Sequence, residues 1–360
     1  MMSEEYFRGI RMAAQADKTA PIHLEMEAFK NLQVIKDYYL VLGGGKIGTD
    51  FLRYALKNRF PFVLIIDRDE NAPASRESRV LKTRSELVNL LREKAKIPPR
   101  EEVAEQLPGT EDKSRSENKR ESKKENKREN KESETYFYAM DMHSIPLLLS
   151  LGIPENIIPA VPCHAVAYIL ADILKFPVQQ TWNEGSQADL PEKEISEINL
   201  SGGNRPVNEL FIRPKDSELM PFFETLAAVF PEDVIAGSYP EYGMLFFSYA
   251  REGEICPDGC PGPRDRCPIF GRNKPKTITE YSRELNNTIS GWVFESHQMK
   301  PGIGGLKGEE FKQNILEIME FVSTLQEERS FRKSEKPKEK AFFIATTCTC
   351  HGVLNLFYIT

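Results

Sequence analysis

The stretch of residues 38–69, YYLVLGGGKIGTDFLRYALKNRFPFVLIIDRD, constrains the fold of this chain more than any other feature. Its first apolar run, residues 39–42, is typical of a buried parallel strand. A glycine-rich turn follows, then a helix over roughly residues 46–57 and a second strand over residues 62–66 that stops at Asp67. This order of strand, glycine turn, helix, strand and acid predicts the first half of a dinucleotide-binding α/β fold.

Each glycine of the turn has its own predicted role in a G-x-G-x-x-G motif. Gly43 allows the tight turn out of the strand, Gly45 lets the backbone approach a pyrophosphate, and Gly48 lets the helix pack against the sheet. The unpaired amides and the positive dipole end of the helix, at Lys46 and Ile47, suit a phosphate group. We therefore expect these five residues to bind the phosphates of a dinucleotide. The alternative is a glycine-rich turn in an α/β sheet that holds no ligand.

The acid at the end of the second strand predicts the type of dinucleotide. Asp67 lies about twenty residues beyond the glycines, where a carboxylate can accept hydrogen bonds from an adenosine ribose. Its charge would repel a 2′-phosphate, which favours NAD over NADP. The positive charge of Arg68, next to Asp67, leaves NADP as an alternative ligand.

Composition and charge limit the class of partner. The chain has 360 residues, of which 40% are hydrophobic, and its formal net charge is -6. The sequence pI of about 5.7 gives no general attraction to nucleic acid or to an anionic membrane. The N-terminus has no apolar signal core, and no apolar run approaches the ~20 residues of a membrane helix. The sequence therefore predicts a soluble cytoplasmic protein that neither binds nucleic acid nor inserts into a membrane.

Shifts in composition divide the chain into regions. Residues 1–37 are expected to form an N-terminal extension and residues 38–175 the nucleotide-binding domain. Within that domain, about residues 105–135 are dominated by Lys, Arg, Glu, Asn and Ser and offer almost no apolar surface to bury. We expect them to form a disordered charged insertion, since their mixed signs argue against a polyelectrolyte contact with nucleic acid. Residues 176–360 are expected to form a second, smaller α/β region.

The fold class follows from alternating strand and helix patterns after the insertion. A third strand is expected at residues 136–140, followed by a helix near 145–151, a strand near 157–161 and a helix over 164–174. Strands that alternate with helices predict a parallel sheet. The predicted fold is α/β, a Rossmann-like doubly wound parallel sheet with the charged insertion and a second, cysteine-containing α/β region.

The runs VLGGGKIG and IIDRDE, and the strand that ends before Asp141, together resemble the TrkA-type (RCK-like) nucleotide-binding domain of potassium-uptake systems. The resemblance implies that the glycines meet the phosphates, that Asp67 meets a ribose and that Asp141 lies near the adenine. It also implies a homodimer and a membrane transporter as partner. The turn GGGKIG is similar, more weakly, to the N-terminal NAD-dependent dehydrogenase domain of sirohaem synthases, which typically lack an acid at the Asp67 position.

Six cysteines raise the question of a metal, since in a cytosolic chain they are expected to be thiols or metal ligands rather than disulfides. Three of them, Cys256, Cys260 and Cys267, lie in a cysteine-rich loop, residues 256–267, stiffened by prolines. Thiolates are the ligands that zinc and iron–sulfur clusters prefer. The C-x3-C-x6-C spacing is standard for neither, and Cys350 is the candidate fourth ligand. Alternative fourth ligands are Cys348, His351 and His297. A reduced loop without metal is the competing interpretation.

Two further segments are candidates for function. His164 follows a strand and opens a helix, where it could serve as a neutral acid/base group facing a nicotinamide, with Cys163 as a thiol whose pKa the helix lowers. The competing interpretation is that both are residues at a helix start without chemistry. The glycines of residues 302–308 precede a helix expected over residues 309–326 and could form an anion-binding loop or a hinge.

Two classes of function are therefore predicted. The first is an NAD(H)-binding redox protein, an oxidoreductase, which the thiols of the cysteine-rich loop suggest. The second is a non-catalytic nucleotide-sensing regulator of the TrkA type.

Overall fold

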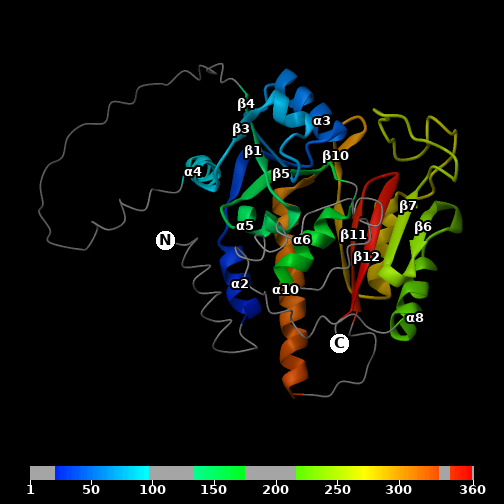
Figure 1. Cartoon of the computed structure of the whole chain (residues 1–360). Helices are drawn as coiled ribbons and strands as arrows, with labels where there is room; N and C mark the ends of the chain where they lie inside the picture. The colour runs from blue at the N-terminus through cyan, green and yellow to red at the C-terminus, as the bar shows by residue number, and fades with distance from the viewer. Residues whose placement is uncertain (1–20, 97–132, 162, 175–215, 332–340, 359–360) are drawn as a thin grey trace, which may run out of the picture.

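The computed structural model describes residues 21–96, 133–161, 163–174, 216–331 and 341–358. They form a mixed α/β structure with two sheets, one of seven strands and one of five (Figure 1). The predicted insertion lies outside the described residues except for its last few positions. Among the described residues, no helix is both long enough and apolar enough to cross a bilayer.

The seven-stranded sheet is parallel over most of its width. Its strand order is β3-β4-β2-β1-β5-β10-β9, and neighbours from β3 to β5 run parallel. β10 is antiparallel to β5, and β9 is antiparallel to β10. The strands are β1 (Val34–Leu42), β2 (Phe62–Asp67), β3 (Arg79–Leu81), β4 (Glu134–Ala139), β5 (Ile153–Pro159), β9 (His297–Lys300) and β10 (Ile303–Lys307).

Apolar strands form the centre of this sheet because both of its faces are covered. Leu40, Val41 and Leu64 are fully buried. One face packs on α3 (Lys46–Lys57) and the short 3-10 helix η1 (Pro73–Glu77), and the other contributes to a core shared with further helices. These are α2 (Pro21–Lys30), α4 (Arg84–Lys94), α5 (Ile145–Leu149), α6 (Ala165–Leu174) and α10 (Gly308–Phe331). Burial on both faces explains why β1 and β2 lack the polar alternation of a half-exposed strand.

The five-stranded sheet has the order β6-β7-β12-β11-β8. Its strands are β6 (Ile235–Tyr239), β7 (Met244–Ser248), β8 (Gly291–Glu295), β11 (Ala341–Thr347) and β12 (His351–Tyr358). Along β11, Phe343 packs on the side of α8 (Asp216–Ala227) and α9 (Ile278–Glu284), whereas Phe342 and Ile344 join the core of the first sheet. Because successive strand residues point to opposite faces, β11 connects two cores. α6 and α10 run between the two sheets (Figure 1).

The glycine-rich segment before α10 differs from the expected loop. Residues 297–307 form the β9–β10 hairpin, and β10 joins the parallel sheet beside β5. A Cβ on Gly304 would lie 2.1 Å from the Ser296 Oγ, and one on Gly308 would lie 1.9 Å from the Pro154 carbonyl oxygen. These glycines therefore permit close packing against a side chain and a backbone carbonyl, and the anion-loop and hinge interpretations of this segment are both wrong.

Candidate functional site

The glycine turn leaves the carboxyl end of β1 and opens α3. Gly43 has a positive φ of 106°, and its amide donates to the Ile66 carbonyl at 2.7 Å. A Cβ on Gly48 would lie 1.9 Å from the Gly43 carbonyl oxygen, so only glycine fits there. A Cβ on Gly45 would meet nothing within 4 Å. The turn is thus closed against the sheet at Gly43 and Gly48 and open at Gly45.

The first turn of α3 is accessible from outside. No side chain caps the helix at Gly45, and the Ile47 side chain is 51% exposed. The Lys46 ammonium donates to an Asp258 carboxylate oxygen at 2.8 Å, and this hydrogen bond raises the Lys46 pKa. Because helix amides at this end have no intrahelical partner, the geometry leaves room for an anion beside Gly45 and Lys46.

Asp67 ties the turn to the end of β2. Its Oδ2 accepts from the Gly44 amide at 2.6 Å and its Oδ1 from the Asp69 amide at 2.9 Å. A carboxylate offers about four lone-pair positions, so these bonds leave acceptor capacity for a ligand hydroxyl. Gly44 itself escaped notice in the sequence, yet a Cβ there would lie 3.0 Å from the Phe137 ring. Arg68, next to Asp67, is exposed.

Asp141 lies at the same edge of the sheet, just beyond the next strand, β4. Its carboxylate accepts from the His143 amide at 2.8 Å and caps the 3-10 helix η2 (Met142–Ser144). The Met140 amide donates to the Asp67 carbonyl at 2.8 Å, which joins the ends of β4 and β2. The structure therefore brings the glycine turn, Asp67 and Asp141 to the carboxyl ends of neighbouring strands.

His164 sits in the interior rather than in an open site. Its side chain is buried, its Nδ1 lies 2.6 Å from Asn355 Oδ1, and its Nε2 lies 2.8 Å from Thr346 Oγ1. Burial lowers the pKa of His164 to about 4, and the bond to Asn355 offsets this in part. A neutral ring that donates from Nδ1 and accepts at Nε2 satisfies both partners. These contacts join the start of α6 to β11 and β12, which favours the structural interpretation of His164 over the catalytic one.

Cys163 differs from the reactive thiol that the sequence suggested. Burial raises the pKa of the Cys163 thiol to about 11, and its sulfur lies 3.8 Å from the Met142 sulfur. The expectation that the helix start would lower this pKa is wrong, because desolvation of the thiolate outweighs the dipole of the helix.

The two cysteine segments come together in space. A Cβ on Gly262, within the cysteine-rich loop, would lie 3.6 Å from the Cys350 sulfur. The Lys274 ammonium donates to that sulfur at 2.7 Å and to the Pro263 carbonyl at 2.5 Å. Cys267 is buried, and the Phe270 amide donates to its sulfur at 3.5 Å.

Within the described residues, no three His, Cys, Asp or Glu side chains stand in a geometry that would hold a metal ion. The cysteine-rich loop and Cys350 lie close together, but their sulfurs do not form a coordination sphere. His297, one of the alternative ligands, pairs instead with Glu310 at 3.0 Å. Cys348 lies in the β11–β12 turn and His351 opens β12, and the Cys348 amide donates to the His351 carbonyl.

The cysteine-rich loop also adjoins the glycine turn, which the sequence did not indicate. Besides the Lys46–Asp258 pair, the Gly302 amide donates to the Cys260 carbonyl at 3.1 Å, and Lys300 pairs with Asp50 of α3. Residues that are more than 200 positions apart therefore share one surface. No local pattern marks Asp258 or Lys274 as different from ordinary surface residues.

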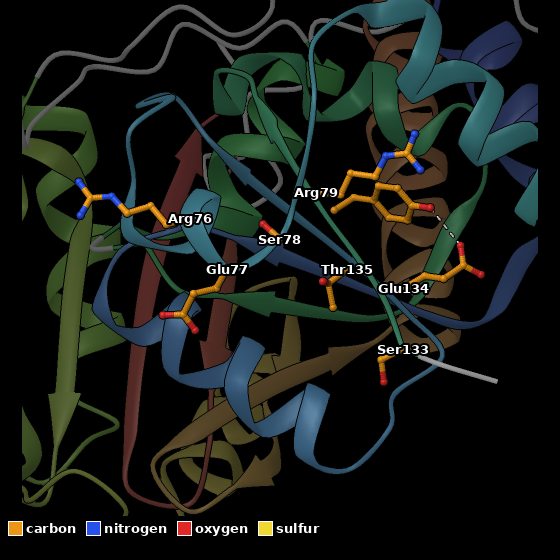
Figure 2. A pocket seen from close by; sticks show the side chains of 8 residues that line it. Arg76, Glu77, Ser78, Arg79, Ser133, Glu134 and Thr135 are labelled. Atoms are coloured by element: carbon orange, nitrogen blue, oxygen red, sulfur yellow. Dashed lines mark hydrogen bonds between the residues drawn. The ribbon is translucent and has the colours of Figure 1, made fainter. Parts of the chain in front are cut away.

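A cavity of about 490 Å³ lies elsewhere, between η1 and the first residues of β3 and β4 (Figure 2). Arg79 lies over the Tyr136 ring at 5.7 Å, and the Tyr136 hydroxyl donates to Glu134 at 3.1 Å. Because this cavity borders the amino end of β4, it is separate from the glycine turn at the carboxyl ends. Ligands of open α/β sheets bind at the carboxyl ends, so we assign the candidate site to the glycine turn.

Comparisons with known proteins give family likeness without an activity. A protein-family model described as "Uncharacterized protein, C-terminal domain" matches residues 210–360, which include the second sheet and both cysteine segments. An "Uncharacterized protein" of Archaeoglobus fulgidus is 25% identical over 316 residues, which cover 88% of this chain and 97% of that protein. No solved structure matches the chain.

Proposed function

We propose that this protein binds NAD(H) through a Rossmann-like half formed by β1, β2, β4 and β5. The observation that carries the proposal is the division of roles within the glycine turn. Gly43 takes a positive φ, Gly48 allows helix and strand to touch, and Gly45 faces open space. A dinucleotide-binding turn needs these three properties at these three positions. A structural turn without a ligand gives no reason for the open space at Gly45.

The strand order supports the same site. From β1 through β2 to β4, the chain builds outward on one side of β1, and it then crosses to β5 on the other side of β1. In open α/β sheets, ligands bind in the crevice at such a reversal, outside the carboxyl ends of the strands. The glycine turn follows β1 directly, so it borders this crevice.

The residues divide the ligand between them. The amides at Gly45, Lys46 and Ile47 would bind the pyrophosphate, with the Lys46 ammonium as a second contact. Asp67 would accept from the ribose hydroxyls, and its charge favours NAD over NADP. Asp141, at the end of β4, would lie towards the adenine. A bound nicotinamide would donate hydride as NADH or accept it as NAD⁺.

Two classes of function follow from binding. We favour a redox protein, because the cysteine-rich loop touches the glycine turn through Lys46 and Asp258. The alternative is a nucleotide sensor of the TrkA type, with a homodimer and a membrane transporter as partner. In that case the Lys46–Asp258 contact would relay a conformational change on nucleotide binding to the cysteine-rich loop, without electron transfer.

The test of binding uses Gly45→Asp. Because Gly45 has open space and a negative φ, the variant should fold, while its carboxylate would repel the pyrophosphate. We expect NADH binding, measured by calorimetry, to be lost. Lys57→Glu is the matched control, since it adds a carboxylate to the other end of α3, about 18 Å away. Wild-type affinity in a folded Gly45→Asp protein would refute the site.

The test between redox protein and sensor is the anaerobic visible absorption spectrum before and after addition of NADH. A chromophore that bleaches with NADH would establish electron transfer between the dinucleotide and the protein. A protein that binds NADH without any spectral change of its own would favour the sensor.

A further inference from the structure

We propose that one thiophilic metal centre, a zinc ion or an iron–sulfur cluster, is bound by four cysteines, with Lys274 as a hydrogen-bond donor to one of the sulfurs. The four are Cys256, Cys260, Cys267 and Cys350. This proposal goes beyond the dinucleotide site and does not depend on it.

Thiols from two distant segments converge in the structure. Gly262 brings the cysteine-rich loop against the Cys350 sulfur, where a Cβ would lie at 3.6 Å. The Lys274 ammonium donates to the Cys350 sulfur at 2.7 Å and to the carbonyl of Pro263, which follows Gly262 in the chain, at 2.5 Å. The loop that reaches Cys350 carries the other three thiols, Cys256, Cys260 and Cys267, within twelve positions.

A tight turn begins at Cys267. The Gly271 amide donates to the Cys267 carbonyl at 2.9 Å, and the Cys267 amide donates to the Arg272 carbonyl at 2.7 Å. This turn aims the Phe270 amide at the Cys267 sulfur at 3.5 Å. An N–H group directed at sulfur stabilises the thiolate, the form that binds metal.

Lys274 places a positive charge beside the thiols. Its side chain is buried, and within the described residues its polar contacts are the Cys350 sulfur and the Pro263 carbonyl. The Tyr249 ring lies 5.7 Å away. A buried ammonium is costly unless an anion compensates it, and here no carboxylate among the described residues does so. Four thiolates around a divalent metal leave a net negative charge, which would compensate Lys274.

These contacts also select the fourth ligand. Cys350 is buried and touches Lys274 and the cysteine-rich loop, whereas His297 is paired with Glu310. Since the sulfurs are not yet in coordinating positions, metal binding must draw the loop inward. Gly259 and Gly262, both with positive φ, shape the turns of this loop.

The experiment measures metal in the full chain purified without oxygen, and again after removal by a chelator and reconstitution. One arm adds zinc alone, and the other adds iron with sulfide. We expect one centre per chain, with loss of metal in Cys267→Ser and Cys350→Ser. Cys348→Ser and Cys163→Ser are the matched controls and should retain it. Lys274→Met should bind about 10- to 100-fold more weakly, as is typical for loss of an outer hydrogen bond.

A second measurement uses only the wild-type protein, so that misfolding of a variant cannot obscure the result. Alkylation mapped by mass spectrometry should modify the four cysteines in the metal-free protein and spare them in the loaded protein. Failure of both reconstitution arms to give a stoichiometric centre would overturn the proposal. Equal alkylation of the four cysteines with and without metal would overturn it as well.

Discussion

Replacing His164 by glutamine should remove a large part of the acid sensitivity of this protein. Glutamine keeps one hydrogen-bond donor and one acceptor for Asn355 and Thr346, but unlike histidine it does not take up a proton in mildly acidic solution. His164 is buried with both ring nitrogens bonded, so the folded protein resists its protonation. The unfolded chain takes up that proton freely.

The magnitude follows from the pKa difference. Burial lowers the pKa of His164 from 6.5 to about 4. Above pH 6.5 the residue is neutral in both states, and its contribution to stability is fully present. As the pH falls from 6.5 to about 4, only the unfolded state binds the proton, and stability falls by about 1.4 kcal/mol per pH unit. The total loss is about 3 kcal/mol, and below the folded pKa no further loss occurs.

The assay is urea unfolding followed by circular dichroism at about pH 8 and about pH 4.5. Because pH 4.5 lies above the folded pKa, the wild type should lose about 2.5 kcal/mol more than His164→Gln between the two conditions. His23→Gln, a change at an exposed histidine, controls for the substitution itself. An identical pH dependence in wild type and His164→Gln would refute the assignment of His164 as a neutral, buried bridge.

Three further predictions concern the glycine turn and its surroundings. Gly48→Ala should destabilise the fold by about 1–3 kcal/mol in urea unfolding, since its Cβ would meet the Gly43 carbonyl oxygen, and an unchanged midpoint would contradict this. Thr277→Ala should cost about 1 kcal/mol by the same assay because it removes the capping box of α9, while Thr277→Ser should cost little. Asp258→Asn should leave the melting temperature unchanged, because its ion pair with Lys46 is exposed. The same variant should bind NADH more tightly in calorimetry, because the Lys46 ammonium is then free to contact a phosphate. Unaltered affinity would count against Lys46 as a phosphate contact.

Local spacing predicted the central elements well. The helix expected over residues 46–57 is α3, and the strand expected over residues 62–66 is β2 with one further residue. β1 begins at Val34, several residues before the expected start, because polar Lys36 and Asp37 interrupt its apolar run. Both lie towards the end of the strand that is less buried, where sequence hydropathy is a poor guide.

Glycine gave the least reliable signal. At Gly43 and Gly48 the motif correctly predicted a local constraint. Gly43 has a positive φ, and Gly48 allows the helix to approach the end of the strand closely. At Gly304 and Gly308 the same residue type reflects contacts with Ser296 and Pro154, which come from elsewhere in the fold. Sequence cannot distinguish a glycine required by its own φ from one required by a neighbour that folding brings near.

The sequence by itself determined the parallel α/β core, the glycine turn and the acid that follows β2. It could do so because strand burial, turn conformation and helix periodicity are set by residues close together in the chain. Only the tertiary structure decided that His164 joins the start of α6 to two strands of the second sheet, that β10 joins the first sheet, and that Lys274 contacts the Cys350 sulfur. Those outcomes depend on which distant surfaces pack together, and on the cost of burying a charge or a ring nitrogen without a partner. That cost depends on the packed interior as a whole, so it cannot be predicted from a short stretch of sequence.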